Sequence, residues 1–415
     1  MWEDRLSGML KRGVRIGALD VVFPSGRRES FGDGGAPVAR VRLTSEAAAR
    51  AIWLDPGLQF AEQYMDGNLI VEEGDLYEFL ALAKKNGARG FASAPAAARE
   101  MGRILHRKLR RHVLPERAQR NVAHHYDLDE KLFRLFLDPD LQYSCAYYET
   151  GDETLEEAQL KKKRHIAAKM QLEPGQKVLD IGCGWGGMGL YLAQTAGVDV
   201  TGVTLAKEQL RVANQRAAEA GVADRARFLL QDYRKVEGRF DRIVSVGMFE
   251  HVGPHHFDEY FAKIRELLTD DGIAVIHSIG RANPNRSDPP FVEKYIFPNG
   301  HIPSLAETFP AIEKSKFLVK DVEILTMHYA DTLREWRRRF HANREAVLEL
   351  YDERFFRMWD LYLITSEISF RFGKLVNFQI ILTRRHAEAP RSRDYIAAAE
   401  SRLAAAEKPP APPSA

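Results

Sequence analysis

The chain has few cysteines, no long apolar run and little excess charge. Cys145 and Cys183 are the only cysteines among 415 residues, which excludes a disulfide framework and indicates a reducing compartment. No apolar run approaches the length of a membrane span. The net charge of +2 gives no global field, so no nucleic-acid partner is expected.

Two further signals are missing. Glu3 and Asp4 follow Trp2 with no apolar stretch behind them, so no signal peptide is expected and a cytoplasmic location follows. His255 and His256 have no acidic or cysteine partner at metal-ligand spacing, so no metal site is expected.

The sequence does contain a glycine-rich loop at the end of an apolar stretch. Residues 178–187 read Val-Leu-Asp-Ile-Gly-Cys-Gly-Trp-Gly-Gly, which is typical of a buried strand that turns sharply into a helix. The free N–H groups at the start of that helix suit a polar ligand. The glycine spacing alone fits either a nicotinamide dinucleotide or S-adenosylmethionine (SAM).

The segment after the loop favours SAM. A nicotinamide site needs an acidic residue at the end of the second strand to hold a ribose. Here the second strand, residues 198–204, is followed by Leu205, with no carboxylate. The order Asp-x-Gly-x-Gly-x-Gly from Asp180 instead resembles the SAM loop of class I methyltransferases. Those enzymes also usually carry an acid after the second strand, so the chain departs from both patterns.

Three sections are expected along the chain. Residues 1–114 form a smaller N-terminal α+β domain with a basic linker, and residues 387–415 form a disordered tail rich in Ala and Pro. Residues 115–386 form the catalytic domain. Strands and helices alternate there, which predicts an α/β fold with a mostly parallel, Rossmann-like sheet and helices on both faces. The expected strands are 177–181, 198–203, 226–230, 240–246 and 273–278, and the expected helices are 187–195, 207–220 and 256–268.

Five short segments carry a family resemblance. They are His124–Leu128, Leu141–Tyr148, Ser245–Gly253, Ile276–Ile279 and His328–Leu333. Together with the glycine loop they closely resemble the cyclopropane-fatty-acid synthase family, which includes the mycolic-acid cyclopropane synthases. The resemblance covers the whole middle section. The N-terminal section is similar in length and placement to the extra domain of the bacterial phospholipid-acting members.

The resemblance implies an enzyme that transfers the methyl group of SAM to a cis double bond of an unsaturated phospholipid acyl chain. A cyclopropane ring then closes, with bound bicarbonate as the base. The implied residues at the reacting centre are Tyr126, Cys145, Glu250, His277, Tyr329 and the backbone of Ile279. The implied SAM residues are Tyr143, Ser144, Asp180, Gly182, Gly184, Thr204, Gln209, Asp232 and Tyr233. In this family Thr204 and Gln209 replace the missing acid.

The residue types suit this chemistry. A sulfonium and a carbocation favour electron-rich aromatic walls, and water has to be excluded because it would trap the cation. Four tyrosines lie within residues 126–148, together with Cys145. Taken alone, Cys145 and His277 are typical of buried core residues, and only the surrounding motifs make them candidate site residues.

Basic runs indicate the surroundings of the substrate. Residues 106–112, 161–164 and 337–339 are basic, and three such runs in a protein with an apolar substrate suit anionic phospholipid headgroups. Peripheral association with the inner face of the membrane is therefore expected. The resemblance to bacterial members is also compatible with a homodimer.

Several alternatives stay open. A fatty-acid C-methyltransferase shares the first steps but leaves a methylene or a methyl branch, and the sequence does not separate it from a cyclopropane synthase. A small-molecule N-methyltransferase, a nicotinamide oxidoreductase, a thiol-nucleophile enzyme using Cys145 and a non-catalytic lipid-binding module each explain fewer of the motifs.

Overall fold

The computed structural model describes residues 1–91, 93–110, 130–283, 289–298, 300–386 and 390–407. Its elements group into two compact units. The N-terminal unit comprises residues 1–117, 285–298 and 333–374, and the Rossmann-like unit comprises residues 118–284, 299–332 and 375–415. The expected division into 1–114 and 115–386 is therefore incomplete, because two segments from the second half of the chain belong to the N-terminal unit.

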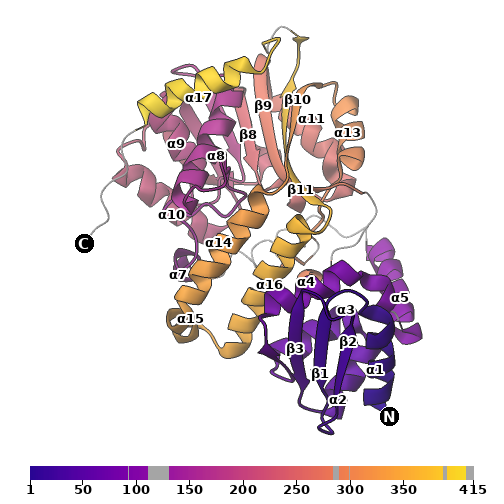
Figure 1. Cartoon of the computed structure of the whole chain (residues 1–415). Coiled ribbons are helices and arrows are strands. Elements are labelled where there is room, and N and C mark those ends of the chain that lie inside the picture. Colours follow the sequence, from indigo (N-terminus) through magenta and orange to yellow (C-terminus); the bar gives the residue numbers. More distant parts are fainter. Residues whose placement is uncertain (92, 111–129, 284–288, 299, 387–389, 408–415) are drawn as a thin grey trace. The chain divides into compact units, whose positions relative to one another are not determined.

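The N-terminal unit contains a four-stranded sheet in the order β2-β1-β3-β4 (Figure 1). β1 and β3 are parallel, and the other neighbours are antiparallel. Alternate residues of β3 are buried and pack with α1, because successive side chains of a strand point to opposite faces. The strands are β1 (Ala18–Val22), β2 (Arg28–Gly32), β3 (Val38–Leu43) and β4 (Leu69–Glu73).

Helices complete the N-terminal unit. α16 packs on α3 and α4, and α12 packs on α3. Glu62 of α3 accepts hydrogen bonds from Lys294 (2.6 Å) and Tyr295 (2.9 Å) of α12. The helices are α1 (Trp2–Gly13), α2 (Glu46–Leu54), α3 (Pro56–Met65), α4 (Leu76–Asn86), α5 (Ala94–Arg110), α12 (Pro290–Tyr295), α15 (Arg344–Leu350) and α16 (Glu353–Arg371), with most of α14 (His328–Ala342).

The Rossmann-like unit contains a seven-stranded sheet in the order β10-β11-β9-β8-β5-β6-β7. The five strands β5 to β9 run parallel to one another, whereas β11 is antiparallel to both of its neighbours, β9 and β10. This arrangement confirms the predicted fold class. The strands are β5 (Lys177–Ile181), β6 (Asp199–Thr204), β7 (Ala226–Leu230), β8 (Phe240–Val246), β9 (Leu268–Arg281), β10 (Leu318–Leu325) and β11 (Leu375–Thr383).

Helices cover both faces of this sheet (Figure 1). On β5, Val178 packs in a core with α8, α9 and α10, whereas Leu179 packs in a second core with α11 and α13. The two cores lie on opposite faces because the side chains of a strand alternate. The helices are α8 (Leu155–Lys169), α9 (Gly187–Ala196), α10 (Lys207–Glu219), α11 (Phe257–Leu267) and α13 (Leu305–Lys314), preceded by the short α7 (Glu130–Arg134).

The strand order reverses at β5. The chain continues from β5 to β6 and β7 on one side, and then returns to β8 on the other side. The carboxyl ends of β5 and β8 therefore flank a topological switch point, which is where ligands bind in open α/β sheets. Gly182 and Gly247 lie immediately after these two strand ends.

The C-terminal segment differs from the expectation. Residues 387–415 are predicted to be disordered, but α17 (Asp394–Ala406) is a helix that packs on α8 and α9. Ile396 and Ala399 pack against Ala168. Alanine and glutamate favour a helix, and the spacing of Ile396, Ala399 and Leu403 places an apolar stripe on one side. The prediction of disorder is wrong for this segment, because it rested on amino-acid composition and did not take the helical spacing of the apolar residues into account.

Candidate active site

Glycines with positive φ shape the loop after β5. Gly182, Gly184 and Gly186 have φ values of 83°, 53° and 84°. A Cβ on Gly182 would lie 2.8 Å from the Cβ of Met248, whereas a Cβ on Gly184 would meet no atom of the described residues within 4 Å. The N–H of Gly182 donates to the carbonyl of Val203 (3.0 Å), which ties the loop to β6. Gly184 therefore offers close approach to the backbone just before α9 begins.

The carboxyl ends of β6 and β7 carry the next candidates. The buried Thr204 hydroxyl at the end of β6 donates to Oε1 of Gln209 at 3.0 Å. Gln209 is also buried, and this hydrogen bond fixes both side chains. Asp232 follows the neighbouring strand β7, and the adjacent Tyr233 packs edge-on against Tyr260 with ring centroids 5.6 Å apart. These implied SAM residues therefore occupy one edge of the sheet together with the glycine loop.

Asp180 precedes this loop and is buried inside the sheet. It is 1% exposed, and its Oδ2 has no hydrogen-bond partner among the described residues. Burial raises the pKa of its carboxyl to about 7, and the Lys162 ammonium opposes that shift. Asp180 therefore holds a proton far more readily than an exposed aspartate does.

The pKa of Asp180 predicts how its substitution acts on stability. Between an unfolded pKa of 3.8 and a folded pKa of about 7, the folded state retains a proton that the unfolded chain has released. Its contribution to stability is therefore lost as the pH rises through this window. In the absence of SAM, the free energy of unfolding of Asp180→Asn should exceed that of the wild type by a margin that grows by about 2 to 3 kcal/mol from pH 5 to pH 8.

Urea unfolding of both proteins at several pH values measures this gain. Asp199→Asn is the control, because Asp199 is exposed at the start of β6. A stability difference that stays constant across the pH range would show that Asp180 does not titrate there.

The loop of residues 141–148, here the tyrosine–cysteine loop, is held by α8. Lys162 is fully buried, and its ammonium donates to Oγ of Ser144 (2.9 Å) and to Oε1 of Gln142. Gln159 donates from Nε2 to the carbonyl of Ser144 at 3.0 Å. Two side chains one helical turn apart therefore fix the backbone that precedes Cys145.

Aromatic rings place Tyr143 beside the glycine loop. The Tyr143 ring contacts Phe133 edge-on at 5.2 Å, and Phe133 contacts Trp185 of the glycine loop at 5.8 Å between ring centroids. The tyrosine–cysteine loop and the glycine loop therefore share one aromatic cluster. This brings the implied SAM residues Tyr143 and Ser144 to the same region as Gly184.

Cys145 and Tyr329 belong to a second cluster. Cys145 is 1% exposed, and its thiol donates to the carbonyl of Ala146 at 3.3 Å. The N–H of Ala146 donates to Oγ1 of Thr332 (3.1 Å), which lies in the first turns of α14 with the buried Tyr329. Burial raises the pKa of the Cys145 thiol, so the thiolate is disfavoured and the nucleophilic reading of Cys145 is not supported.

Glu250 and Ile279 are in direct contact. Oε1 of Glu250 accepts the N–H of Ile279 at 2.7 Å, and Oε2 is buried without a partner in the part of the chain that the structure describes. Burial raises the pKa of this carboxyl to about 7. At neutral pH the carboxyl can therefore carry a proton and donate it to a nearby anion.

His277 lies on β9, two residues before Ile279. It is 1% exposed, and burial lowers the pKa of its ring well below the usual value, so the ring is neutral. Its Nε2 lies 2.6 Å from the Asn377 amide and its Nδ1 lies 3.0 Å from the Gln379 amide, both on β11. Since both ring nitrogens are engaged, the implied contact of His277 with a bound anion stays a prediction that requires one of these bonds to open.

The implied residues therefore fall into three groups: the SAM set around the glycine loop, Cys145 with Tyr329, and Glu250 with His277 and Ile279. Lys162 acts electrostatically on both Cys145 and His277. Tyr126 lies outside the described residues. The described part contains no group of three His, Cys, Asp or Glu side chains placed to hold a metal ion, and none of its helices is long and apolar enough to cross a bilayer.

Four polar residues of this region were not among the predicted site residues. They are Gln159, Lys162, Asn377 and Gln379. For the two on α8 a signal existed, because Leu155, Ala158, Gln159, Lys162 and Ile166 recur at helical spacing and therefore share the buried face. No comparable local signal marks Asn377 and Gln379, whose role depends on pairing with a strand about 100 residues earlier.

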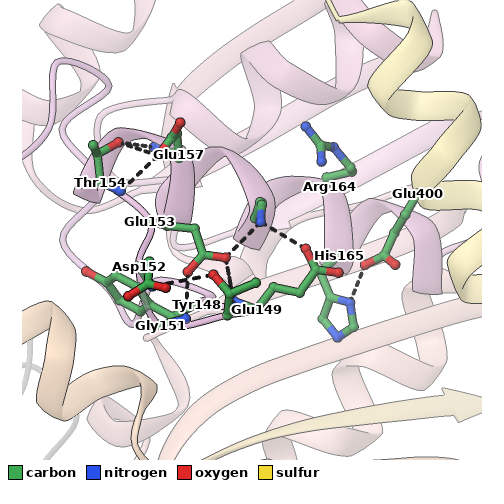
Figure 2. Close-up of polar contacts among 12 residues, drawn as sticks. Tyr148, Glu149, Gly151, Asp152, Glu153, Thr154, Glu157, Arg164, His165 and Glu400 are labelled. Atoms are coloured by element: carbon green, nitrogen blue, oxygen red, sulfur yellow. Dashed lines mark hydrogen bonds and ion pairs between the residues drawn. The ribbon is translucent and has the colours of Figure 1, made fainter.

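The basic run 161–164 is not a headgroup-binding surface, and that part of the expectation is wrong. Lys161 bridges Glu149 (2.9 Å) and Glu153 (2.8 Å), and Arg164 binds Glu407. Figure 2 shows the turn before α8, where the Glu153 carboxylate also accepts the N–H groups of residues 149–151. The run 106–112 lies partly outside the described residues.

Comparisons with known proteins identify a matching family model and several similar chains. Residues 114–380 match the family model for mycolic acid cyclopropane synthetase. The chain is 38% identical over 352 residues to the cyclopropane-fatty-acyl-phospholipid synthase of Escherichia coli (strain K12), covering 85% of this chain and 89% of the relative. It is 36% identical over 266 residues to cyclopropane mycolic acid synthase 1 of Mycobacterium tuberculosis (strain H37Rv), covering 61% and 93%.

Solved structures show the same relationship. The cyclopropane synthase MmaA2 from Mycobacterium tuberculosis has a TM-score of 0.62 at 32% identity, covering 64% of this chain and 97% of that chain. Mycolic acid cyclopropane synthase CmaA1, complexed with SAH and CTAB, has a TM-score of 0.61 at 35% identity, covering 64% and 97%. The family match spans the glycine loop and all three residue groups, so this chain belongs to the mycolic acid cyclopropane synthetase family of class I SAM-dependent methyltransferases.

Proposed function

We propose that this enzyme is a cyclopropane-fatty-acyl-phospholipid synthase. A bond forms between the methyl carbon of SAM and one alkene carbon of a cis-unsaturated acyl chain while the methyl–sulfur bond breaks, which leaves S-adenosylhomocysteine and a carbocation. Loss of a proton from the new methyl group then provides the electron pair for the second carbon–carbon bond. The product carries one additional CH2 as a ring.

One observation carries the choice of a phospholipid substrate. The match to the E. coli phospholipid synthase extends over 352 residues, which is more than the 298 residues (415 − 117) that follow Arg117. It therefore includes part of residues 1–117. The match to the mycolic acid synthase covers 266 residues. The longer match to a relative named for a phospholipid substrate supports a lipid-presenting role for residues 1–117.

SAM supplies an electrophilic methyl group when bound. The residues that would hold it are the glycine loop with Asp180, the pair Thr204 and Gln209, and the flanking residues Tyr143, Ser144, Asp232 and Tyr233. The open side of Gly184 and the fixed Thr204 hydroxyl fit this role, because a nucleoside needs close backbone approach and directional polar partners.

Bicarbonate would supply the base when bound. Glu250 fits an anion, since its unpartnered Oε2 is buried and its raised pKa lets it donate a proton. Cys145 and Tyr329 provide S–H and O–H donors, and the Lys162 ammonium makes the local potential more positive. The N–H of Ile279 already binds Glu250, so it would be shared with the anion. A base fixed by several hydrogen bonds removes a proton efficiently without attacking the cation.

We also propose that the enzyme works at the inner face of the membrane. α5 ends in the basic run that begins at His106, and a basic helix binds anionic lipid surfaces. The resemblance to bacterial family members supports a cytoplasmic enzyme that associates peripherally with the membrane. It also supports a homodimer, which sedimentation tests.

Product analysis tests the reaction. The purified protein is incubated with SAM and vesicles of a cis-unsaturated phospholipid, and the released fatty esters are analysed by mass spectrometry before and after mild hydrogenation. We expect a gain of one CH2 that resists hydrogenation. Vesicles of a saturated phospholipid are the matched control, and they should show no gain.

Two outcomes would contradict the proposal. A gain of one CH2 followed by uptake of hydrogen means that a double bond survives, and the protein is then a branching fatty-acid methyltransferase. No gain on any phospholipid would point to small-molecule acceptors.

A further inference from the structure

A line of buried polar contacts leads away from His277. The Gln379 amide lies 3.0 Å from Nδ1 of His277, and Lys169 donates from Nζ to Oε1 of Gln379 at 2.7 Å. Lys169 is fully buried and also binds the Glu323 carboxylate. Oε2 of Glu323 lies 2.6 Å from Nε2 of His165. These contacts, here called the histidine relay, connect β9, β11, α8 and β10.

The outer end of the relay lies on α17. Nδ1 of His165 is 2.6 Å from Oε1 of Glu400 (Figure 2), and the Arg393 guanidinium at the start of α17 lies 3.2 Å from Glu323. The His165 ring also stacks on Tyr147, with centroids 4.2 Å apart and planes 11° apart. α17 therefore reaches the tyrosine–cysteine loop through His165, and the line towards His277 through His165 and Arg393.

The relay determines which nitrogen of His277 carries the proton. Because the Lys169 ammonium can only donate, it requires the carbonyl oxygen of Gln379 to face it. The amide nitrogen of Gln379 then donates to Nδ1 of His277, which must be unprotonated. In the neutral ring the proton therefore sits on Nε2. The Asn377 amide, whose nitrogen faces Nε2 in the structure, has to be turned over so that its oxygen accepts that proton. This orientation also gives a partner to the Asn377 oxygen.

We propose that α17 is a positioning element of the active site, which acts through the histidine relay to fix the tautomer and orientation of His277. Its effect on turnover rests on the proposed function, whereas its effect on the His277 tautomer does not. Apolar packing alone does not explain the arrangement, because a buried ammonium is costly unless its partners are held in place. Glu323, His165, Glu400 and Arg393 hold those partners.

Two variants remove a residue of the histidine relay, and a control variant replaces a residue of the same region that makes no contact with the relay. Lys169→Met removes the group that orients Gln379, and Glu400→Ala removes the α17 carboxylate that contacts His165 of α8. Glu407→Gln is the control, since Glu407 anchors the same helix through Arg164 and Tyr191 and makes no relay contact. Thermal unfolding of each variant verifies that it is folded.

Two readouts are needed. Nitrogen-15 NMR of the histidine rings, assigned by a His277→Gln variant, should show an Nε2-protonated ring in the wild type and a tautomer mixture in Lys169→Met. In cyclopropanation assays, kcat should fall about tenfold in Lys169→Met and about threefold in Glu400→Ala, with an unchanged KM for SAM. Lys169→Arg should recover part of the loss, and Glu407→Gln should stay within about twofold of the wild type.

The outcomes separate the two proposals. An Nε2-protonated His277 in folded Lys169→Met, or a Glu400→Ala variant that behaves like Glu407→Gln, would overturn the positioning role. If the wild type makes no cyclopropane while Lys169→Met still changes the tautomer, the proposed function fails and the positioning role stands.

Discussion

Replacing Glu250 with glutamine should reduce turnover at least about 100-fold while the affinity for SAM stays near that of the wild type. The amide oxygen of glutamine can still accept the N–H of Ile279, so the local backbone is retained. What is lost is a buried carboxyl with a pKa of about 7, which can exchange a proton with a bound anion. The SAM residues lie in a separate group around the glycine loop and should not respond.

Turnover is measured by the product assay, and SAM affinity by calorimetry. Glu266→Gln is the matched control, because Glu266 is exposed on α11 and pairs only with Lys263 of the same helix among the described residues. Near-wild-type turnover in Glu250→Gln would remove Glu250 from the reaction. Equal losses of turnover and SAM affinity would instead indicate a disturbed fold.

Gly184→Ala should weaken SAM binding at least about 100-fold with a much smaller effect on stability. The added methyl group meets no atom of the described residues within 4 Å, so the protein itself tolerates it sterically. The φ of 53° lies in the left-handed region, where alanine costs about 1 kcal/mol. The methyl group therefore occupies space next to the backbone that we assign to SAM.

Gly221→Ala separates the two effects. Gly221 has a φ of 67° and equally open surroundings, but it lies in the turn after α10, outside the glycine loop. Both variants should lose similar stability in thermal unfolding, and only Gly184→Ala should lose SAM binding in calorimetry. If the two variants bind SAM equally well, Gly184 does not border the SAM site.

The parts of the fold that the sequence predicts are those with strong local patterns. β5, β7 and β8 begin and end at the predicted residues, because short apolar runs flanked by turn residues mark them. The tyrosine–cysteine loop has no such local pattern. One of the contacts that place it is the hydrogen bond from the Ala146 N–H to Thr332, 186 residues later. Long-range contacts of this kind leave no local signature, so motifs identify the loop but do not place it.

The errors have a common physical origin. Composition describes what a segment contains, whereas burial depends on the spacing of its residues. The basic run around Lys162 therefore indicates a charged surface by composition, although helical spacing turns Lys162 inward. In the same way the Ala- and Glu-rich segment around Glu400 indicates disorder, although its apolar residues recur every three to four positions.

The split composition of the N-terminal unit governs when it can fold. Residues 1–117 are synthesised first, but α16 and the remainder of the unit end only at Lys374. At about 5–20 residues per second, the 257 intervening residues (374 − 117) take on the order of 10 to 50 s to emerge from a ribosome. During that time the faces of α3 and α4 that pack on α16 stay uncovered. The unit whose synthesis begins first is therefore among the last to be completed.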